Sequence, residues 1–175
     1  MKIQIPTTIP ILVPALTGLA LADSFNLYAY GDGIGAAVVS KRKAENATDP
    51  DVVSFTSSNG RLVGNPNATS SSSDPTFTDA LLSIPGPDSN SHEVAFINSA
   101  GSSSGSDEHV TNKFVWYGHT LLVEDNEGAY TSLFSAKKSD DSDGTYSLLW
   151  NVTDFDSEVG DVITVSMRSV APSTE

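Results

Sequence analysis

The stretch from Lys113 to Val170 decides the fold: KFVWYGHTLLVEDNEGAYTSLFSAKKSDDSDGTYSLLWNVTDFDSEVGDVITVSMRSV. It consists of short apolar segments rich in Val, Thr, Tyr, Phe and Trp, which are the residue types favoured in β-strands. Acidic, Gly-containing turns such as Asn126-Glu127-Gly128 and Asp143-Gly144 separate the segments, and tight reversals of the chain require these residue types. The pattern predicts an antiparallel sheet onto which the rest of the chain packs.

The upstream chain repeats this alternation of strands and turns. In FNLYAY, residues 25–30, the apolar Phe25, Leu27 and Ala29 alternate with more polar neighbours, which predicts a strand with one buried face. Further strands are expected over residues 36–39, 51–56, 61–64 and 92–99. Asn59-Gly60, between the second and the third of these, is a strong signal for a hairpin. TFTDALLSIP, residues 76–85, fits either a strand or a short turn of helix.

Short strands at this spacing, with no long segment of helical periodicity, are typical of an all-β fold. We expect an antiparallel β-sandwich, jelly-roll-like, with about eight to ten strands. Residues 23–175 would form this single domain. A chain of this length can bury a core of its own without a partner.

Residues 1–22 predict a secretory signal peptide. Lys2 is followed by an apolar segment that ends in Ala20-Leu21-Ala22. The small residues Ala20 and Ala22, at the minus-three and minus-one positions, favour cleavage before Asp23. Pro6, Pro10 and Pro14 interrupt the apolar run, which favours a cleaved leader over a membrane anchor. The sequence therefore predicts a secreted, extracellular protein with no membrane attachment after cleavage.

The charge balance bears on the possible partners. The chain has 9 Lys and Arg against 22 Asp and Glu, a net charge of −13. So acidic a surface disfavours nucleic acid and anionic membranes, because both are bound through Lys and Arg. It favours a soluble protein that is monomeric. The chain has no Cys, so neither disulfides nor thiolate chemistry are available to it.

Three Asn-x-Ser/Thr sequons stand at Asn46, Asn67 and Asn151, in or beside expected loops. In a chain that enters a eukaryotic secretory pathway, they predict N-glycosylation.

No residue pattern in the sequence calls for a metal or another cofactor. His92, His109 and His119 lack a second ligand at metal-binding spacing, and we expect each of them on the surface or in a hairpin. Asp140, Asp141 and Asp143 form an acidic turn that calcium could occupy, but the turn lacks the EF-hand pattern and a solvated turn is favoured.

Catalysis by paired carboxylates has two candidates, Glu93 and Glu124, on expected strands. A glycoside hydrolase would need them to face another carboxylate across a cleft. No Gly-x-Ser-x-Gly motif indicates an esterase. The sequence therefore assigns no catalytic residue.

Aromatic residues offer a route to carbohydrate binding, since sugars stack on exposed rings. Trp116 and Trp150 alternate with apolar residues and are expected in the core. Tyr28, Tyr30 and Tyr117 lie outside such patterns, so they are the candidates for a stacking surface.

Four segments, FNLYAYGDGIG (25–35), FVWYGHT (114–120), GTYSLLW (144–150) and VITVSMRSVAPS (162–173), resemble an uncharacterised family of small secreted proteins of filamentous fungi. AAVVSKRKAENATD (36–49) departs from that pattern, in which an aromatic strand follows the glycine turn. The resemblance carries over no catalytic residue. It implies a fungal source, secretion and association with the cell wall.

The sequence thus favours a non-enzymatic, N-glycosylated extracellular or cell-wall-associated protein, with cell-wall polysaccharide or a host surface as the partner. A carbohydrate-binding module is the first alternative and a glycoside hydrolase the second.

Overall fold

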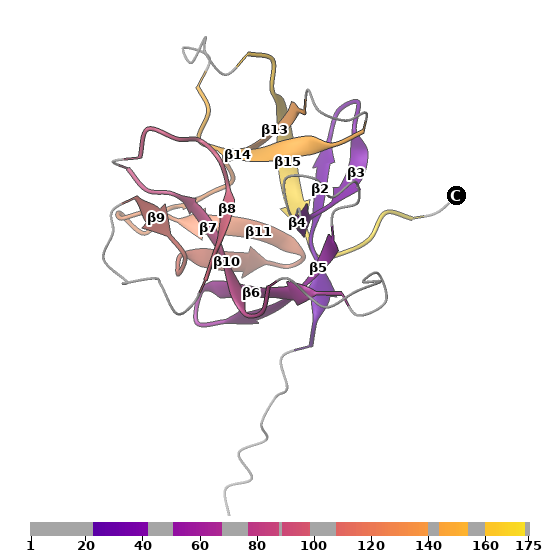
Figure 1. The fold of residues 1–175 in the computed structure, drawn as a ribbon. Helices are drawn as coiled ribbons and strands as arrows, with labels where there is room; N and C mark the ends of the chain where they lie inside the picture. Colours follow the sequence, from indigo (N-terminus) through magenta and orange to yellow (C-terminus); the bar gives the residue numbers. More distant parts are fainter. Residues whose placement is uncertain are drawn as a thin grey trace, which may run out of the picture.

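The computed structural model describes residues 23–41, 51–67, 77–87, 89–98, 108–139, 144–153 and 160–173. These residues form two antiparallel sheets, which confirms the all-β, sandwich-like class. In Figure 1, β2, β3, β13, β14 and β15 occupy the upper part of the molecule, and β5 and β6 lie below. The described residues include no helix that could span a membrane.

The first sheet has seven strands in the described residues, in the order β1-β5-β6-β7-β8, with β4 beside β5 and β9 beside β7. Their bounds are β1 Phe25–Asn26, β4 Ser40–Lys41, β5 Asp51–Ser58, β6 Arg61–Pro66, β7 Ala80–Pro85, β8 Ala95–Asn98 and β9 His109–Val110.

Within the described parts of the chain, the second sheet has eight strands, in the order β10-β11-β15-β13-β14, with β12 beside β11, β2 beside β15 and β3 beside β2. Their bounds are β2 Tyr28–Gly31, β3 Gly35–Val38, β10 Phe114–Tyr117, β11 Thr120–Glu124, β12 Tyr130–Thr131, β13 Phe134–Lys138, β14 Tyr146–Trp150 and β15 Ile163–Arg168.

The described residues thus contain fifteen strands, more than the eight to ten expected. One reason is that two segments of the chain, residues 25–31 and 35–41, each divide between the sheets. β1 pairs with β5 in the first sheet, whereas β2, which follows after Leu27, pairs with β15 in the second. Residues 35–41 make the same change at Val39, because β3 pairs with β2 and β4 pairs with β5. The Val39 N–H donates to the Leu27 carbonyl at 2.8 Å, so the two crossing points are bonded to each other.

The sheets also meet at a second edge. Glu93 forms an isolated antiparallel bridge with Leu149 of β14, just before β8 begins. On either side of the bridge, the Val94 N–H donates to the Leu148 carbonyl at 2.9 Å, and the Trp150 N–H donates to the His92 carbonyl at 2.8 Å. The two sheets are therefore continuous at one edge through the crossing strands and hydrogen-bonded to each other at the second, which leaves fewer unpaired strand edges.

The expected hairpin at Asn59-Gly60 is confirmed. Asn59 and Gly60 have φ of 51° and 73°, and Ser58 pairs with Arg61 across a two-residue loop. Positive φ at both positions defines the type I′ turn, for which Asn-Gly is the preferred sequence.

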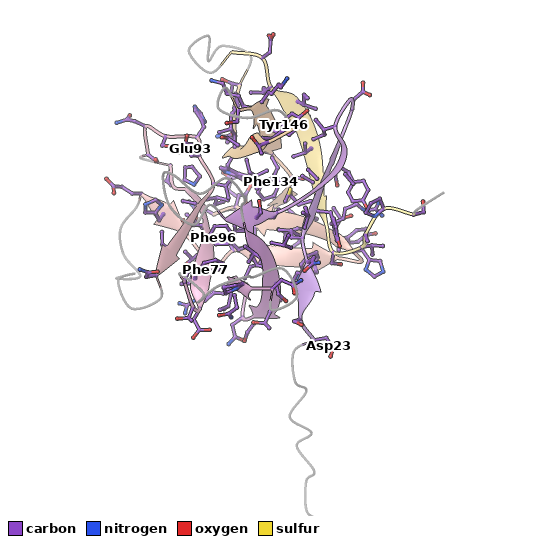
Figure 2. The ribbon with its side chains drawn as sticks, turned by 45° about the vertical axis from the view of Figure 1, so that its right-hand side comes forward. Asp23, Phe77, Glu93, Phe96, Phe134 and Tyr146 are labelled. Carbon is purple, nitrogen blue, oxygen red and sulfur yellow. The ribbon has the colours of Figure 1, made fainter. Side chains whose placement is uncertain are left out.

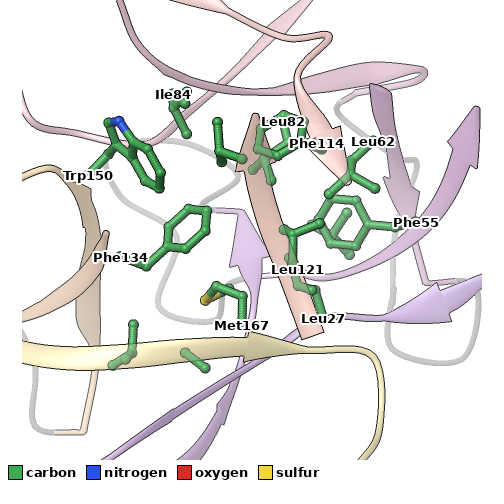
Figure 3. Close-up of a cluster of buried hydrophobic side chains, with 14 of the residues drawn as sticks. Leu27, Phe55, Leu62, Leu82, Ile84, Phe114, Leu121, Phe134, Trp150 and Met167 are labelled. Carbon is green, nitrogen blue, oxygen red and sulfur yellow. The ribbon is translucent and has the colours of Figure 1, made fainter. Parts of the chain in front are cut away.

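The core lies between the sheets (Figure 3). Leu27, Phe55, Leu62, Phe134 and Met167 are fully buried in it. The inward face expected for residues 25–30 is confirmed, because Leu27 and Ala29 are buried and Phe25 packs against the core.

Trp150 lies in the core as expected, whereas Trp116 packs against the core and stays half-buried. The Trp150 ring is buried and lies 4.8 Å from the Phe134 ring, measured between centroids. Trp116 is half-buried against the core, and its Nε1–H donates to the Ser57 hydroxyl at 3.2 Å. The sequence of residues 76–85 fits either a strand or a turn of helix, and in the structure residues 80–85 form the fully buried strand β7.

The β5–β6 turn also anchors the second sheet. The Phe114 N–H donates to the Gly60 carbonyl at 3.0 Å. A Cβ atom at Gly60 would lie 2.5 Å from the Asn112 carbonyl oxygen, so only glycine fits between the two segments. Gly128 also has a positive φ, of 83°, but a Cβ atom there would meet nothing within 4 Å.

This contrast predicts the effects of two alanine substitutions on the free energy of unfolding. We expect Gly128→Ala to cost about 1 kcal/mol, because alanine disfavours a positive φ. Gly60→Ala should cost about 3 kcal/mol, because the backbone at Asn112 must also move. Chemical denaturation of both variants measures the difference. Equal losses would contradict the contact between the turn and Asn112.

Candidate functional site

Strand register places one row of side chains across the outer face of the second sheet. Thr120 of β11 lies opposite Tyr117 of β10 on one side and opposite Arg168 of β15 on the other. Arg168 in turn lies opposite Tyr28 of β2. Directly opposed residues project from the same side of a sheet. We call these four residues the tyrosine row.

The row faces away from the core. In each strand the neighbours that alternate with its members pack in or against the core, namely Trp116, Leu121, Met167 and Ala29. Tyr117 is 79% exposed, Arg168 is also exposed, and Thr120 and Tyr28 are half-buried. The row spans three inter-strand spacings, about 14 Å. It is therefore an outward-facing row with an aromatic ring at each end and a guanidinium group between them.

Tyr30 lies on the same face but has a different role. Its hydroxyl donates to the Val170 carbonyl at 2.7 Å, which holds the chain that follows β15. The Arg168 guanidinium carbon lies 5.4 Å from the centre of the Tyr30 ring, in a cation–π contact. Of the three tyrosines predicted from the sequence, Tyr28 and Tyr117 therefore belong to the row, and Tyr30 positions Arg168.

The two candidate carboxylates do not come together. Glu93 lines a cavity of about 400 Å³ that also contains Ala29 and Tyr146. Glu124 lines a separate cavity of about 470 Å³, beside His92 and Trp150. Among the described lining residues, the first cavity has no second carboxylate.

In the second cavity the neighbouring carboxylate is Asp125. Its Oδ1 atom accepts hydrogen bonds from the N–H groups of Glu127 and Ala129, both at 2.8 Å. Asp125 therefore stabilises a turn. Among the described residues that line either cavity, no pair of free carboxylates faces across a cleft.

The histidines bond to nearby protein groups instead of to one another. His109 Nδ1 lies 3.2 Å from the hydroxyl of the buried Ser83, and His119 Nδ1 lies 3.4 Å from the Ser169 hydroxyl. His92 Nδ1 lies 3.1 Å from the Trp150 carbonyl. Within the described parts of the chain, no three His, Asp or Glu side chains gather as metal ligands. The calcium candidates Asp140, Asp141 and Asp143 lie outside the described residues.

The sequons differ in their surroundings. Asn151 follows β14 and has an exposed side chain, a φ of 54° and an N–H that donates to the Leu133 carbonyl at 2.8 Å. The hydroxyl-bearing residue of its sequon, Thr153, is exposed too. Asn67 is half-buried, and its N–H donates to the Val52 carbonyl. Asn46 lies outside the described residues. A glycan on Asn151 would stand at the second cavity, which Asn151 lines.

Sequence reasoning missed Thr120 and Arg168. Alternation in ITVSMR does indicate that Arg168 faces away from the buried Val165 and Met167. Alternation does not predict that β15 pairs with β2 and β11, and this pairing brings together residues that are far apart in the sequence.

No protein-family model, curated protein or solved structure shows significant similarity to this chain. Its site is therefore interpreted from its own geometry.

The exposed sequon predicts a glycan on Asn151 in protein secreted from a eukaryotic host. Peptide mapping after treatment with peptide N-glycosidase should find aspartate at position 151. Thr153→Val removes the sequon while it keeps Asn151, whose left-handed backbone suits asparagine, and should abolish the modification. Unmodified Asn151 in the secreted wild-type protein would contradict this assignment.

Proposed function

We propose that the protein is a non-enzymatic, N-glycosylated extracellular protein that binds neutral cell-wall polysaccharide through the tyrosine row. The observation that carries this proposal is the alignment of Tyr117, Thr120, Arg168 and Tyr28 across four adjacent strands.

The chemistry of the row suits a sugar chain. Tyrosine rings have an apolar face, on which the C–H face of a pyranose can stack, and a hydroxyl that can remain in water. Arg168 supplies several N–H donors for sugar hydroxyls between the two rings. Its contact with the Tyr30 ring restrains the guanidinium group, which lowers the entropy that binding costs.

The shape of the site favours a polymer over a small sugar. A row about 14 Å long can contact several residues of an extended chain at once. The net charge of −13 disfavours acidic polysaccharides, since like charges repel. These two features together support a neutral glucan or chitin as the partner.

A hydrolytic role has less support than binding. Glu93 and Glu124 line separate cavities, and neither of them lies in the tyrosine row. With no carboxylate of the row available for general acid catalysis, the geometry favours retention of the polymer without cleavage.

The proposal predicts retention of the purified protein, residues 23–175, on at least one of insoluble glucan, chitin and cellulose. Tyr117→Ala and Tyr28→Ala should each weaken binding about tenfold, equivalent to about 1.4 kcal/mol. The measurement is depletion of the protein from solution over a range of polymer concentrations.

Tyr130→Ala is the matched control. Tyr130 is also exposed, at 57%, but it pairs with Glu124, four residues along β11 from Thr120. We expect this variant to bind like the wild type, and unchanged thermal unfolding would show that all three variants are folded. Absence of retention on every polymer, or an equal loss in Tyr130→Ala, would overturn the proposal.

A further inference from the structure

The cavity that contains Glu93 opens between the two sheets. On one side it is bounded by the β2–β3 hairpin and the chain that leads to β4, and on the other by residues 93–96 and by β14. Its volume of about 400 Å³ lies within the range of small-molecule sites in proteins. Figure 2 shows Glu93 and Tyr146 in the upper part of the molecule, away from Asp23 at the bottom.

Small side chains create the space. Ala29 and Ala37 lie directly opposite each other on β2 and β3, and Ala95 and Ala136 line other parts of the cavity. Leu82, which is buried in the core, also lines it. Four alanines around one cavity leave a volume that larger side chains would fill, and the cavity reaches the core of the sandwich.

The walls are apolar and partly exposed. Val39, Val94, Phe96, Tyr146 and Leu148 line the cavity, and each of them is a half-buried residue that packs against the core. Removal of their remaining exposed apolar surface from water is favourable, which supports the binding of an apolar molecule in the cavity.

The polar groups are few, and one of them is charged. Ser40, Glu93 and Ser147 line the cavity, together with Tyr146, and Glu93 is the one ionisable carboxylate among its described lining residues. The Glu93 backbone is fixed by its bridge to Leu149 and by the N–H that donates to the Ser91 hydroxyl at 3.1 Å. The Glu93 side chain is exposed, which places its charge at the opening.

We propose that this cavity binds a small amphipathic amine, with an apolar body against Phe96, Val94 and Leu148 and a protonated amino group beside Glu93. The charge of Glu93 and the acidity of the whole chain both favour a cation over a neutral or anionic head group. The site is independent of the tyrosine row, because Ala29 faces the cavity from β2 whereas Tyr28 faces outward.

The test uses the fluorescent probe N-phenyl-1-naphthylamine, which is apolar, in buffer of physiological ionic strength that screens diffuse attraction to the surface. Wild-type protein should bind the probe saturably at one site. Octylamine should displace it about tenfold more effectively than 1-octanol, and it should raise the midpoint of thermal unfolding, because a ligand that binds only the folded state stabilises it.

Two pairs of variants locate the site. Ala37→Phe should fill the cavity and abolish probe binding, whereas Ala36→Phe, on the opposite side of β3, should leave it unchanged. Glu93→Gln should keep probe binding and remove the preference for octylamine, whereas Glu124→Gln, in the other cavity, should retain that preference. The glutamine variants remain informative even where Ala37→Phe fails to fold.

Several outcomes would overturn the inference. Absence of saturable probe binding in the wild type, or unchanged binding in a folded Ala37→Phe, would show that the cavity is not the site. Equal displacement by octylamine and 1-octanol, or a preference lost in both glutamine variants, would contradict the role of Glu93. None of these outcomes bears on polysaccharide retention, which depends on Tyr117 and Tyr28.

Discussion

The hydrogen bond between the Val39 N–H and the Leu27 carbonyl marks the place on which the rest of the structure depends. At this bond two successive strands pass from one sheet into the other. Because β2 then lies between β15 and β3, its alternation presents Tyr28 to the outer face and Ala29 to the inside. One stretch of four residues therefore contributes to both the tyrosine row and the apolar cavity.

Aromatic packing, not disulfide bonding, holds the first sheet to this crossing point. Ring centroids lie 6.2 Å apart between Phe25 and Phe55, and 6.0 Å apart between Phe55 and Phe96. The second of these contacts passes over Gly64, where a Cβ atom would lie 3.2 Å from the Phe96 ring and 2.7 Å from a Val53 methyl group. Gly64 thus helps rings from β5 and β8 to meet over β6 and β7, which lie between those two strands. In a chain without Cys, contacts of this kind and the buried aliphatic residues supply the stability.

Local sequence patterns predicted the features that depend on neighbouring residues. Asn59-Gly60 specified its own turn because few residue pairs tolerate positive φ at both positions. Alternation over residues 25–30 correctly separated the buried Leu27 from Tyr28, and the apolar neighbours of Trp150 correctly placed that ring in the core.

Features that depend on distant pairings could not be predicted in this way. The sequence does not specify that β15 lies between β2 and β11, so Arg168 could not be predicted as a member of the tyrosine row. Ala37 and Ala95 are unremarkable as residues and gain importance only because they line one cavity. For the same reason, the sequence could not show whether Glu93 or Glu124 faces another carboxylate, and the structure places the two residues in separate cavities.

The most direct test of this account is native-state hydrogen exchange at the two edges where the sheets join. The amides of Val39 and Val94 should exchange slowly, with protection on the order of 10⁴ or more. The Val39 bond opens only when the two crossing segments part, and the Val94 bond opens only when the sheets separate at β14. Exchange at both amides that is as fast as in an open turn such as Gly33 would contradict closure at these edges. The shared basis of the tyrosine row and the cavity would then be lost.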